Sequence, residues 1–442
     1  MNSQSLAVSA PQQPAAGRLA AAVELAPRSL VPLLALTLPL EFTQLYFPVR
    51  EVTLGRLVIG ACIVALALQW LLRVRPVELP PLRAWLPAAV FTGYATASAV
   101  VTGSSDGVKT IGAMVAYGAL ALAIWSWSRS VADQERLWTW FAISVIAVAV
   151  VGLVEYMTGK YIWNPPDEGF WRINATFKDP NIYARFLTIG IVTAIVLTAR
   201  EGSRWRPVLL VAIVIGAAAL PFTFSRQGWV LGGSVLVLAV LLSRRRAVAL
   251  GLGAAAVAIF ASIVVFDPDV RLRLTVFQKF LTSPHSPLFD TPLLAWLNVL
   301  PLDGIRHYLI AAGFQMFFDH PLLGVGFGRF QDMMLGPYHA FILQGFDTTE
   351  SHTSFVTIIA ELGIVGLAIV AWWAFELLRT IVGVARSRSR LQPYAIAGAL
   401  ALLLILLQSQ VEGRLFTEPY AWLFIGAVLA TSVRTPEPSP EA

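Results

Sequence analysis

Long apolar stretches, separated by short polar segments, run through almost the whole chain. A transmembrane helix needs about 20 mostly apolar residues, and several stretches reach that length with no charged residue. The stretches that meet the requirement are 29–49, 53–72, 84–105, 110–128, 137–154, 181–199, 207–225, 226–243, 247–266, 353–378, 391–411 and 415–433. The pattern therefore predicts an all-α integral membrane protein with about twelve transmembrane helices.

The composition excludes a soluble enzyme. Hydrophobic residues make up 57% of the 442 residues and charged residues only 13%, with a mean hydropathy of +0.70, whereas a soluble domain carries about 25% charged residues. Too few charges remain to keep two or three soluble cores in water. Cys62 is the single cysteine, which also excludes a disulfide-stapled or zinc-ribbon protein.

Basic residues indicate how the chain is oriented. More than half of the 32 Lys and Arg residues lie in alternate loops on one side of the predicted spans, with Arg244, Arg245 and Arg246 in one such loop. Basic residues mark cytoplasmic loops, so we expect both termini in the cytoplasm. The net charge of +6 then follows from topology, and we expect no nucleic-acid partner.

The spans and loops predict five segments. Residues 1–28 are expected to form a disordered cytoplasmic tail, 29–266 transmembrane helices one to nine, and 267–351 an extracytoplasmic cap loop. Residues 352–433 complete the set with helices ten to twelve, and 434–442 form a second disordered tail.

The cap loop is far longer than the usual connection of about 4–6 residues. Asp303 is suited to cap a helix that carries Arg306 in its first turn and ends at 319–321. Apolar residues recur along it at helical spacing: Ile305, Leu309, Ala312 and Met316. A second, amphipathic helix is expected around 272–281, on the membrane surface. The loop is therefore predicted to be a small folded cap above an opening in the bundle.

Several arginines on the cap side are candidates for anion binding. Arg226 stands in FTFSRQGW, where a new helix starts with its positive end outward, a good position for a diphosphate. For Arg226 the alternative is an interfacial side chain that reaches lipid phosphate, and for Arg306 a solvated charge. Arg172 and Arg185 bracket RINATFKDPNIYAR, in which Asn181 belongs to a predicted helix start.

His352 lies at the mouth of the tenth span, in ESHTSFVTIIAELGIVG. A lone histidine is more often structural than catalytic, but a neutral imidazole at a polar mouth can take a proton from a sugar hydroxyl. Glu350 or Glu361 would orient it, and the sequence does not choose between them.

Two further site types are not favoured. The glycine-rich GVGFGRF, residues 324–330, follows no strand and lacks the Lys-Ser/Thr of a nucleotide loop, so it is predicted to be a tight backbone turn. No cluster has metal-ligand spacing. We therefore expect neither a metal nor another cofactor.

Four motifs together resemble the O-antigen ligase and O-antigen polymerase superfamily of bacterial membrane proteins. They are ATFKDPN before span six, FSRQGW at span eight, RHYLIAAGFQMFFDHPLLGVGFGRF in the long loop, and SHTSFVTIIAELGIVGL at span ten. The twelve spans and the large loop before the last three are similar to that family as well. The resemblance covers the second half of the chain and part of the first.

The resemblance implies metal-independent, inverting transfer of a glycan from undecaprenyl diphosphate, a polyprenyl diphosphate carrier, at the outer face of the bacterial plasma membrane. The acceptor would be a hydroxyl of another glycan, of lipid A core or of a protein. His352 matches the family's general base, and Arg226 and Arg306 match the arginines that hold the diphosphate. Thr353 departs from the Asn that follows the histidine in many relatives. The family's acidic residue between the last two spans would be Glu412 or Glu418.

Two other functions compete. A transporter of a small solute or ion such as bicarbonate would place polar residues at mid-membrane in broken helices, whereas here the ionisable residues gather at span ends and in loops. An inactive scaffold in an envelope-building complex is the other alternative.

Overall fold

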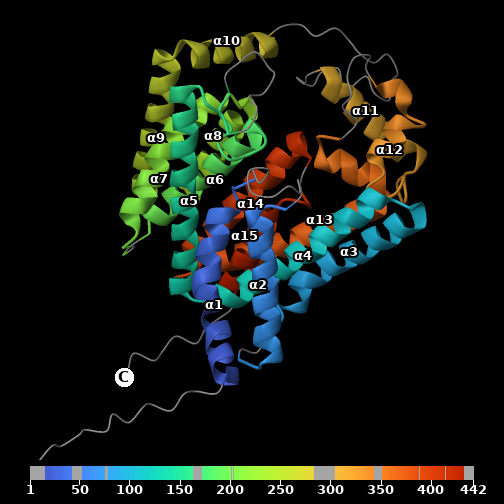
Figure 1. Cartoon of the computed structure of the whole chain (residues 1–442). Coiled ribbons are helices and arrows are strands. Elements are labelled where there is room, and N and C mark those ends of the chain that lie inside the picture. Colours follow the sequence, from blue (N-terminus) through green and yellow to red (C-terminus); the bar gives the residue numbers. More distant parts are fainter. Residues whose placement is uncertain are drawn as a thin grey trace, which may run out of the picture.

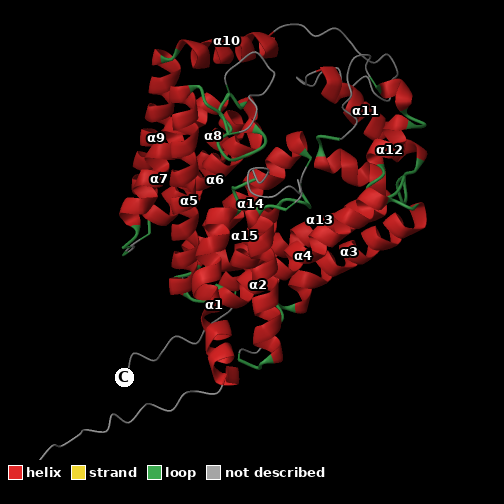
Figure 2. Ribbon diagram, in the orientation of Figure 1, coloured by secondary structure: helices red, strands yellow, loops and turns green. Residues whose placement is uncertain are grey.

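The structure, a computed structural model, is helical throughout its regular parts. It describes residues 15–41, 52–74, 78–162, 172–200, 202, 204–282, 304–342, 351–387, 389–413 and 415–432. Figure 2 shows helices joined by loops, with no strand among these residues. The predicted all-α class is confirmed.

The helices follow one another with short connections in most of the chain. In order they are α1 (Ala15–Thr37), α2 (Leu54–Leu71), α3 (Leu82–Thr102), α4 (Ser105–Trp127), α5 (Val131–Thr158), α6 (Pro180–Thr198), α7 (Arg206–Ala219), η1 (Leu220–Thr223), α8 (Arg226–Leu242), α9 (Arg246–Phe266), α10 (Pro268–Thr282), α11 (Gly304–Asp319), α12 (Phe330–Leu335), η3 (His339–Phe341), α13 (Ser354–Arg386), α14 (Gln392–Glu412) and α15 (Pro419–Thr431).

Membrane-spanning helices form the body of the molecule (Figure 1). Within the described residues, ten helices are long and apolar enough to cross a membrane, and they fall on ten of the predicted spans. The other two spans correspond to α8 and α15, which have 17 and 13 residues. At 1.5 Å per residue these measure about 25 and 20 Å, less than a hydrocarbon core of about 30 Å. The multi-pass architecture is therefore confirmed, and the count of twelve stays a prediction.

The first helix corrects one expected boundary. The tail was predicted to reach residue 28 and the first span to cover 29–49, but α1 already begins at Ala15 and ends at Thr37. The reason is the alanine-rich sequence of its first half, because alanine has the highest helix propensity. The remaining parts of the predicted first tail and first span, and the second tail, lie outside the described residues, at 1–14, 42–51 and 433–442.

A buried amide compensates for a proline inside α1. Pro27 has no N–H, so the carbonyl of Val23 loses its usual helical donor. The Gln69 Nε2 atom donates to that carbonyl at 2.9 Å, and Gln69 Oε1 accepts from Trp127 Nε1 at 2.8 Å. Gln69 therefore joins α1, α2 and α4 through one fully buried side chain.

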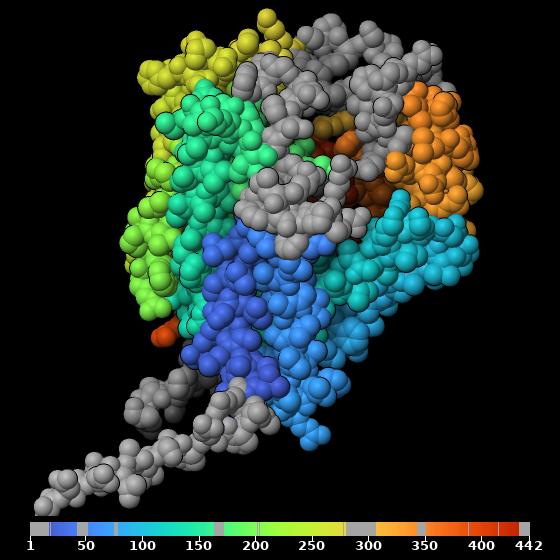
Figure 3. Space-filling model, in the orientation of Figure 1, coloured from blue at the N-terminus to red at the C-terminus, as the bar shows by residue number. Residues whose placement is uncertain are grey.

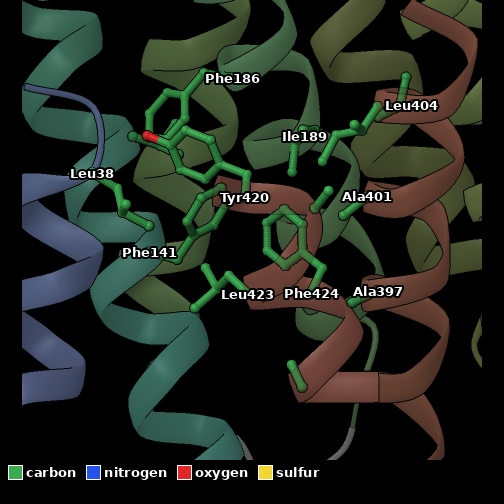
Figure 4. Packing of buried hydrophobic residues seen from close by; sticks show 14 of the residues in the cluster. Leu38, Phe141, Phe186, Ile189, Ala397, Ala401, Leu404, Tyr420, Leu423 and Phe424 are labelled. Atoms are coloured by element: carbon green, nitrogen blue, oxygen red, sulfur yellow. The ribbon is translucent and has the colours of Figure 1, made fainter. Parts of the chain in front are cut away.

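The core surrounds α6, whose side chains are nearly all buried. Aromatic rings from α5, α6 and α15 pack together beside it (Figure 4). Trp138 and Phe424 stack with ring centroids 5.4 Å apart, and Phe141 packs edge-on against Phe186 at 5.3 Å. Because it is held on all sides, α6 is a rigid support for the residues at its N-terminus.

A break in α13 receives the glycine-rich loop. At Gly363 the backbone leaves the helical region (φ 62°, ψ −160°), and the N–H groups of Ile364 and Val365 donate to carbonyls of Pro321 and Leu322. Gly324, Gly326 and Gly328 all have positive φ, as a tight turn requires. The predicted turn at 324–330 is confirmed, and it anchors the cap to the bundle.

The cap helices lie at the same end of the bundle, α10 next to α9 and α11 and α12 on the opposite side (Figure 1). As predicted, α11 ends at Asp319, and Leu309 and Met316 on it are buried with Phe330. The Tyr338 hydroxyl donates to Asp319 at 2.7 Å, and burial together with this carboxylate raises the pKa of Tyr338. The helix expected around 272–281 is α10; its place on the membrane surface stays a prediction. Asp303 lies outside the described residues.

Candidate functional site

Five helix ends meet on the cap side of the bundle. They are the N-termini of α6, α8, α11 and α13 and the C-terminus of α14, and polar contacts between them are described below. Figure 3 shows a hollow on this side, between the cap helices and the bundle. Helix N-termini carry partial positive charge, so such an assembly favours an anionic ligand.

A buried network fixes the start of α8. Asn181 Oδ1 accepts from Arg172 Nη2 at 2.9 Å and from Ser225 Oγ at 2.8 Å, and Arg172 Nε donates to the Thr223 carbonyl at 3.0 Å. Ser225 caps α8 by accepting from the N–H of Gly228 at 3.2 Å. Arg172 and Asn181, both predicted site residues, therefore support the turn that precedes Arg226.

Glu412, at the end of α14, links α8 with α11. Its Oε1 atom accepts from Gln227 Nε2 at 3.1 Å and lies 4.0 Å from Arg306 Nη2. Arg226, the first residue of α8, directly precedes Gln227. The structure thus brings Arg306 and Gln227, the chain neighbour of Arg226, to one carboxylate, although they are far apart in the sequence.

His352 reaches the same place through a close backbone contact. A Cβ atom on Gly413 would lie 2.5 Å from the Ser351 carbonyl oxygen and 3.4 Å from the His352 Cα atom. Gly413 directly follows Glu412 and has a φ of 68°, which glycine adopts without strain. His352 is half-buried. The end of α14 therefore packs against the backbone of the segment that contains the candidate base.

Arg185 and Glu418 form a separate, buried ion pair. The Arg185 guanidinium donates to the Glu418 carboxylate, and both side chains are buried. A charge in a helix interior needs such a partner, because removal from water is costly. Of the two acidic candidates, Glu412 lies beside Gln227 and Arg306, and Glu418 neutralises Arg185.

Glu361 binds the glycine-rich loop rather than a histidine. Its two carboxylate oxygens accept from the N–H groups of Gly328 and Phe330, each at 2.9 Å. The sequence offered Glu361 as a partner of His352, but a carboxylate inside the break of α13 satisfies backbone donors that are otherwise unpaired. The other candidate, Glu350, lies outside the described residues.

Two hollows adjoin the site. A polar cavity of about 350 Å³ touches Ser351 and Gly413; its lining also includes Asp106, Lys109, Thr110, Gly328, Phe330, Gln331, Thr357 and Glu361. A second, mostly apolar groove of about 130 Å³ lies between α6, α7, α8 and α9 and includes Trp229, one turn after Arg226. Among the described residues, no three His, Cys, Asp or Glu side chains group as metal ligands would; the absence of a metal stays a prediction.

Sequence reasoning missed the polar links that assemble the site. The contacts of Gln227 with Glu412, of Ser225 with Asn181 and of Gly413 with Ser351 all join residues far apart in the chain. Gln227 itself stands out beside Arg226 at the start of a mostly apolar helix, but nothing in the local sequence identifies Glu412 as its partner.

The fold and the site define a multi-pass, all-α membrane protein with a cationic site at one end of its bundle. Residues 209–371 match the family described as O-Antigen ligase. The match confirms the superfamily resemblance, and the matched segment contains Arg226, Arg306 and His352. The family match supports glycan transfer of the O-antigen ligase or polymerase type, with a lipid-linked donor and a glycan acceptor. The comparison with curated proteins gives no match.

Proposed function

We propose that the protein transfers a glycan from undecaprenyl diphosphate to an acceptor hydroxyl at the outer face of the bacterial plasma membrane. The observation that carries the proposal is that Arg306 and the chain segments that contain Arg226 and His352 meet at the end of α14. The arginine-rich loops at the opposite helix ends support cytoplasmic termini and an extracytoplasmic site. The family match does not favour the transporter alternative.

Arg226 and Arg306 hold the diphosphate in this proposal. Guanidinium groups form paired hydrogen bonds with phosphate, and the N-terminal ends of α8 and α11 add positive potential. Arg172 and Arg185, already engaged by Asn181 and Glu418, are assigned to support rather than to ligand binding.

His352 acts as the general base. It takes the proton of the acceptor hydroxyl while that oxygen attacks the anomeric carbon on the face opposite the diphosphate. The new C–O bond forms as the bond to the phosphate oxygen breaks, and the electron pair leaves with the lipid diphosphate, whose charge the two arginines stabilise. The configuration inverts, the proton passes from the imidazolium to water, and no metal is required.

The two hollows suit the two substrates. The apolar groove starts one turn from Arg226 and is lined by side chains such as Trp229, Leu236 and Phe260, which suits the polyprenyl tail. The polar cavity beside His352 offers hydroxyl, amide, carboxylate and ammonium groups, which suit the hydroxyls of a sugar. The acceptor is then a glycan, lipid A core or a protein.

Transfer by the purified full chain in nanodiscs tests this proposal. With undecaprenyl-diphosphate glycan and candidate acceptors, we expect His352→Ala to lower the rate about 10²–10⁴-fold, the usual contribution of a general base. We expect Arg226→Ala and Arg306→Ala to lower it about 10²-fold or more by removing charge stabilisation.

The exposed His339, on the cap, provides the matched control. His339→Ala should transfer at the wild-type rate, and so should the wild type in excess chelator. Equal rates for His352→Ala and His339→Ala would refute the assignment of the base, and activity lost in chelator and restored by a divalent ion would refute the metal-free mechanism.

A further inference from the structure

A basic cavity lies at the end of the bundle opposite the candidate site. Its volume is about 570 Å³, within the range of roughly 300–1,000 Å³ of small-ligand pockets. It is lined by Val131, Ala199, Arg200, Arg244, Arg245, Arg390 and Pro393. These belong to the start of α5, the end of α6, the segment after α8 and the start of α14. Since α6 has 19 residues, the two sites lie about 28 Å apart along it.

The cavity keeps positive charge at Arg244. Arg200 is neutralised, because its Nη2 atom lies 2.5 Å from Glu135 Oε1 and its guanidinium also contacts Tyr394. Arg244 instead donates to neutral acceptors, the side chain of Gln392 and the Ser389 carbonyl at 3.2 Å. These bonds hold the guanidinium in place without cancelling its charge.

Arg245 and Arg390 complete the cationic lining, and none of the lining residues is acidic. The N-termini of α5 and α14 face this end of the bundle, so their dipoles add to the positive potential. A cavity of this kind selects a compact anion such as a phosphate group.

Apolar side chains adjoin the arginines. Leu241 and Leu242, in the last turn of α8 just before Arg244, are 52% and 48% exposed, and Leu250 on α9 is 61% exposed. Exposed leucines beside a phosphate-binding cavity fit an amphipathic ligand, whose chains contact the leucines while its headgroup meets the arginines.

We propose that this cavity binds the phosphate headgroup of an anionic phospholipid. The inference does not rest on glycan transfer, because the cavity shares no residue with the candidate site. Each basic residue near a charged membrane surface contributes about 1 kcal/mol, or about fivefold in affinity.

Lipid binding by the full chain in detergent, measured by native mass spectrometry, tests the proposal. The probes are dioleoylphosphatidylglycerol and, for comparison, dioleoylphosphatidylcholine. We expect the triple variant Arg244→Gln/Arg245→Gln/Arg390→Gln to bind phosphatidylglycerol about 100-fold more weakly. Arg390 lies in an exposed turn, and Arg390→Gln alone should weaken phosphatidylglycerol binding about fivefold. This single variant replaces the triple variant in the test if the triple variant fails to fold.

The matched control is Arg206→Gln/Arg246→Gln/Arg386→Gln, which removes the same charge from the same face outside the cavity. It should bind phosphatidylglycerol as the wild type does. Equal losses in the two triple variants would overturn the proposal in favour of diffuse surface charge. If glycerol phosphate displaces the lipid with an affinity equal to that of the lipid itself, the lipid assignment is overturned in favour of a soluble phosphate ligand.

Discussion

Replacement of Glu361 by glutamine should detach the glycine-rich loop from α13. Both oxygens of Glu361 accept from backbone N–H groups, those of Gly328 and Phe330, and the side chain is only 5% exposed. Glutamine keeps one acceptor and turns an NH₂ group toward the second N–H. A hydrogen bond to a charged group contributes about 1.5–3 kcal/mol, and an unsatisfied buried donor costs about 1–3 kcal/mol.

We therefore expect Glu361→Gln to lower the free energy of local opening by about 2–4 kcal/mol. Since 1.4 kcal/mol corresponds to a factor of ten, amide hydrogen exchange in the segment 324–330 should become at least about 30-fold faster. Exchange measured by mass spectrometry on the purified protein gives this rate directly.

Glu376, on the same helix, provides the control for Glu361. It is also buried, and its carboxylate lies 3.8 Å from Arg379. Glu376→Gln should leave exchange in 324–330 unchanged. If Glu361→Gln also leaves it unchanged, the carboxylate does not hold the loop and the reasoning is refuted.

Two further substitutions test other contacts. Gly413→Ala places a Cβ atom 2.5 Å from the Ser351 carbonyl oxygen at a φ of 68°. We therefore expect this substitution to displace His352 and to lower the rate of glycan transfer at least tenfold. An unchanged rate would show that the contact does not position the base. Gln69→Leu leaves the Val23 carbonyl and the Trp127 indole N–H unpaired. We expect this to lower the free energy of unfolding by about 2–4 kcal/mol and with it the melting temperature. An unchanged melting temperature would contradict the bridging role of Gln69.

The sequence singled out candidate site residues but not their partners. Arg226 and Arg306 could be recognised because a charge stands out at the start of an apolar or partly apolar helix. The partners of Arg172, Arg185 and Glu361 could not, since each comes from another segment and hydrogen bonds carry no marker in the local sequence.

Hydrophobic pattern and composition by themselves determined the membrane class, the positions of nearly all the helices and the tight turn at 324–330. They could do so because a bilayer demands long apolar helices whatever their neighbours are. Only the tertiary structure decided that Glu412 lies beside Gln227 and Arg306, whereas Glu418 pairs with Arg185. That choice depends on which helix ends meet, and helix packing sets it through contacts such as that of Gly413 with Ser351.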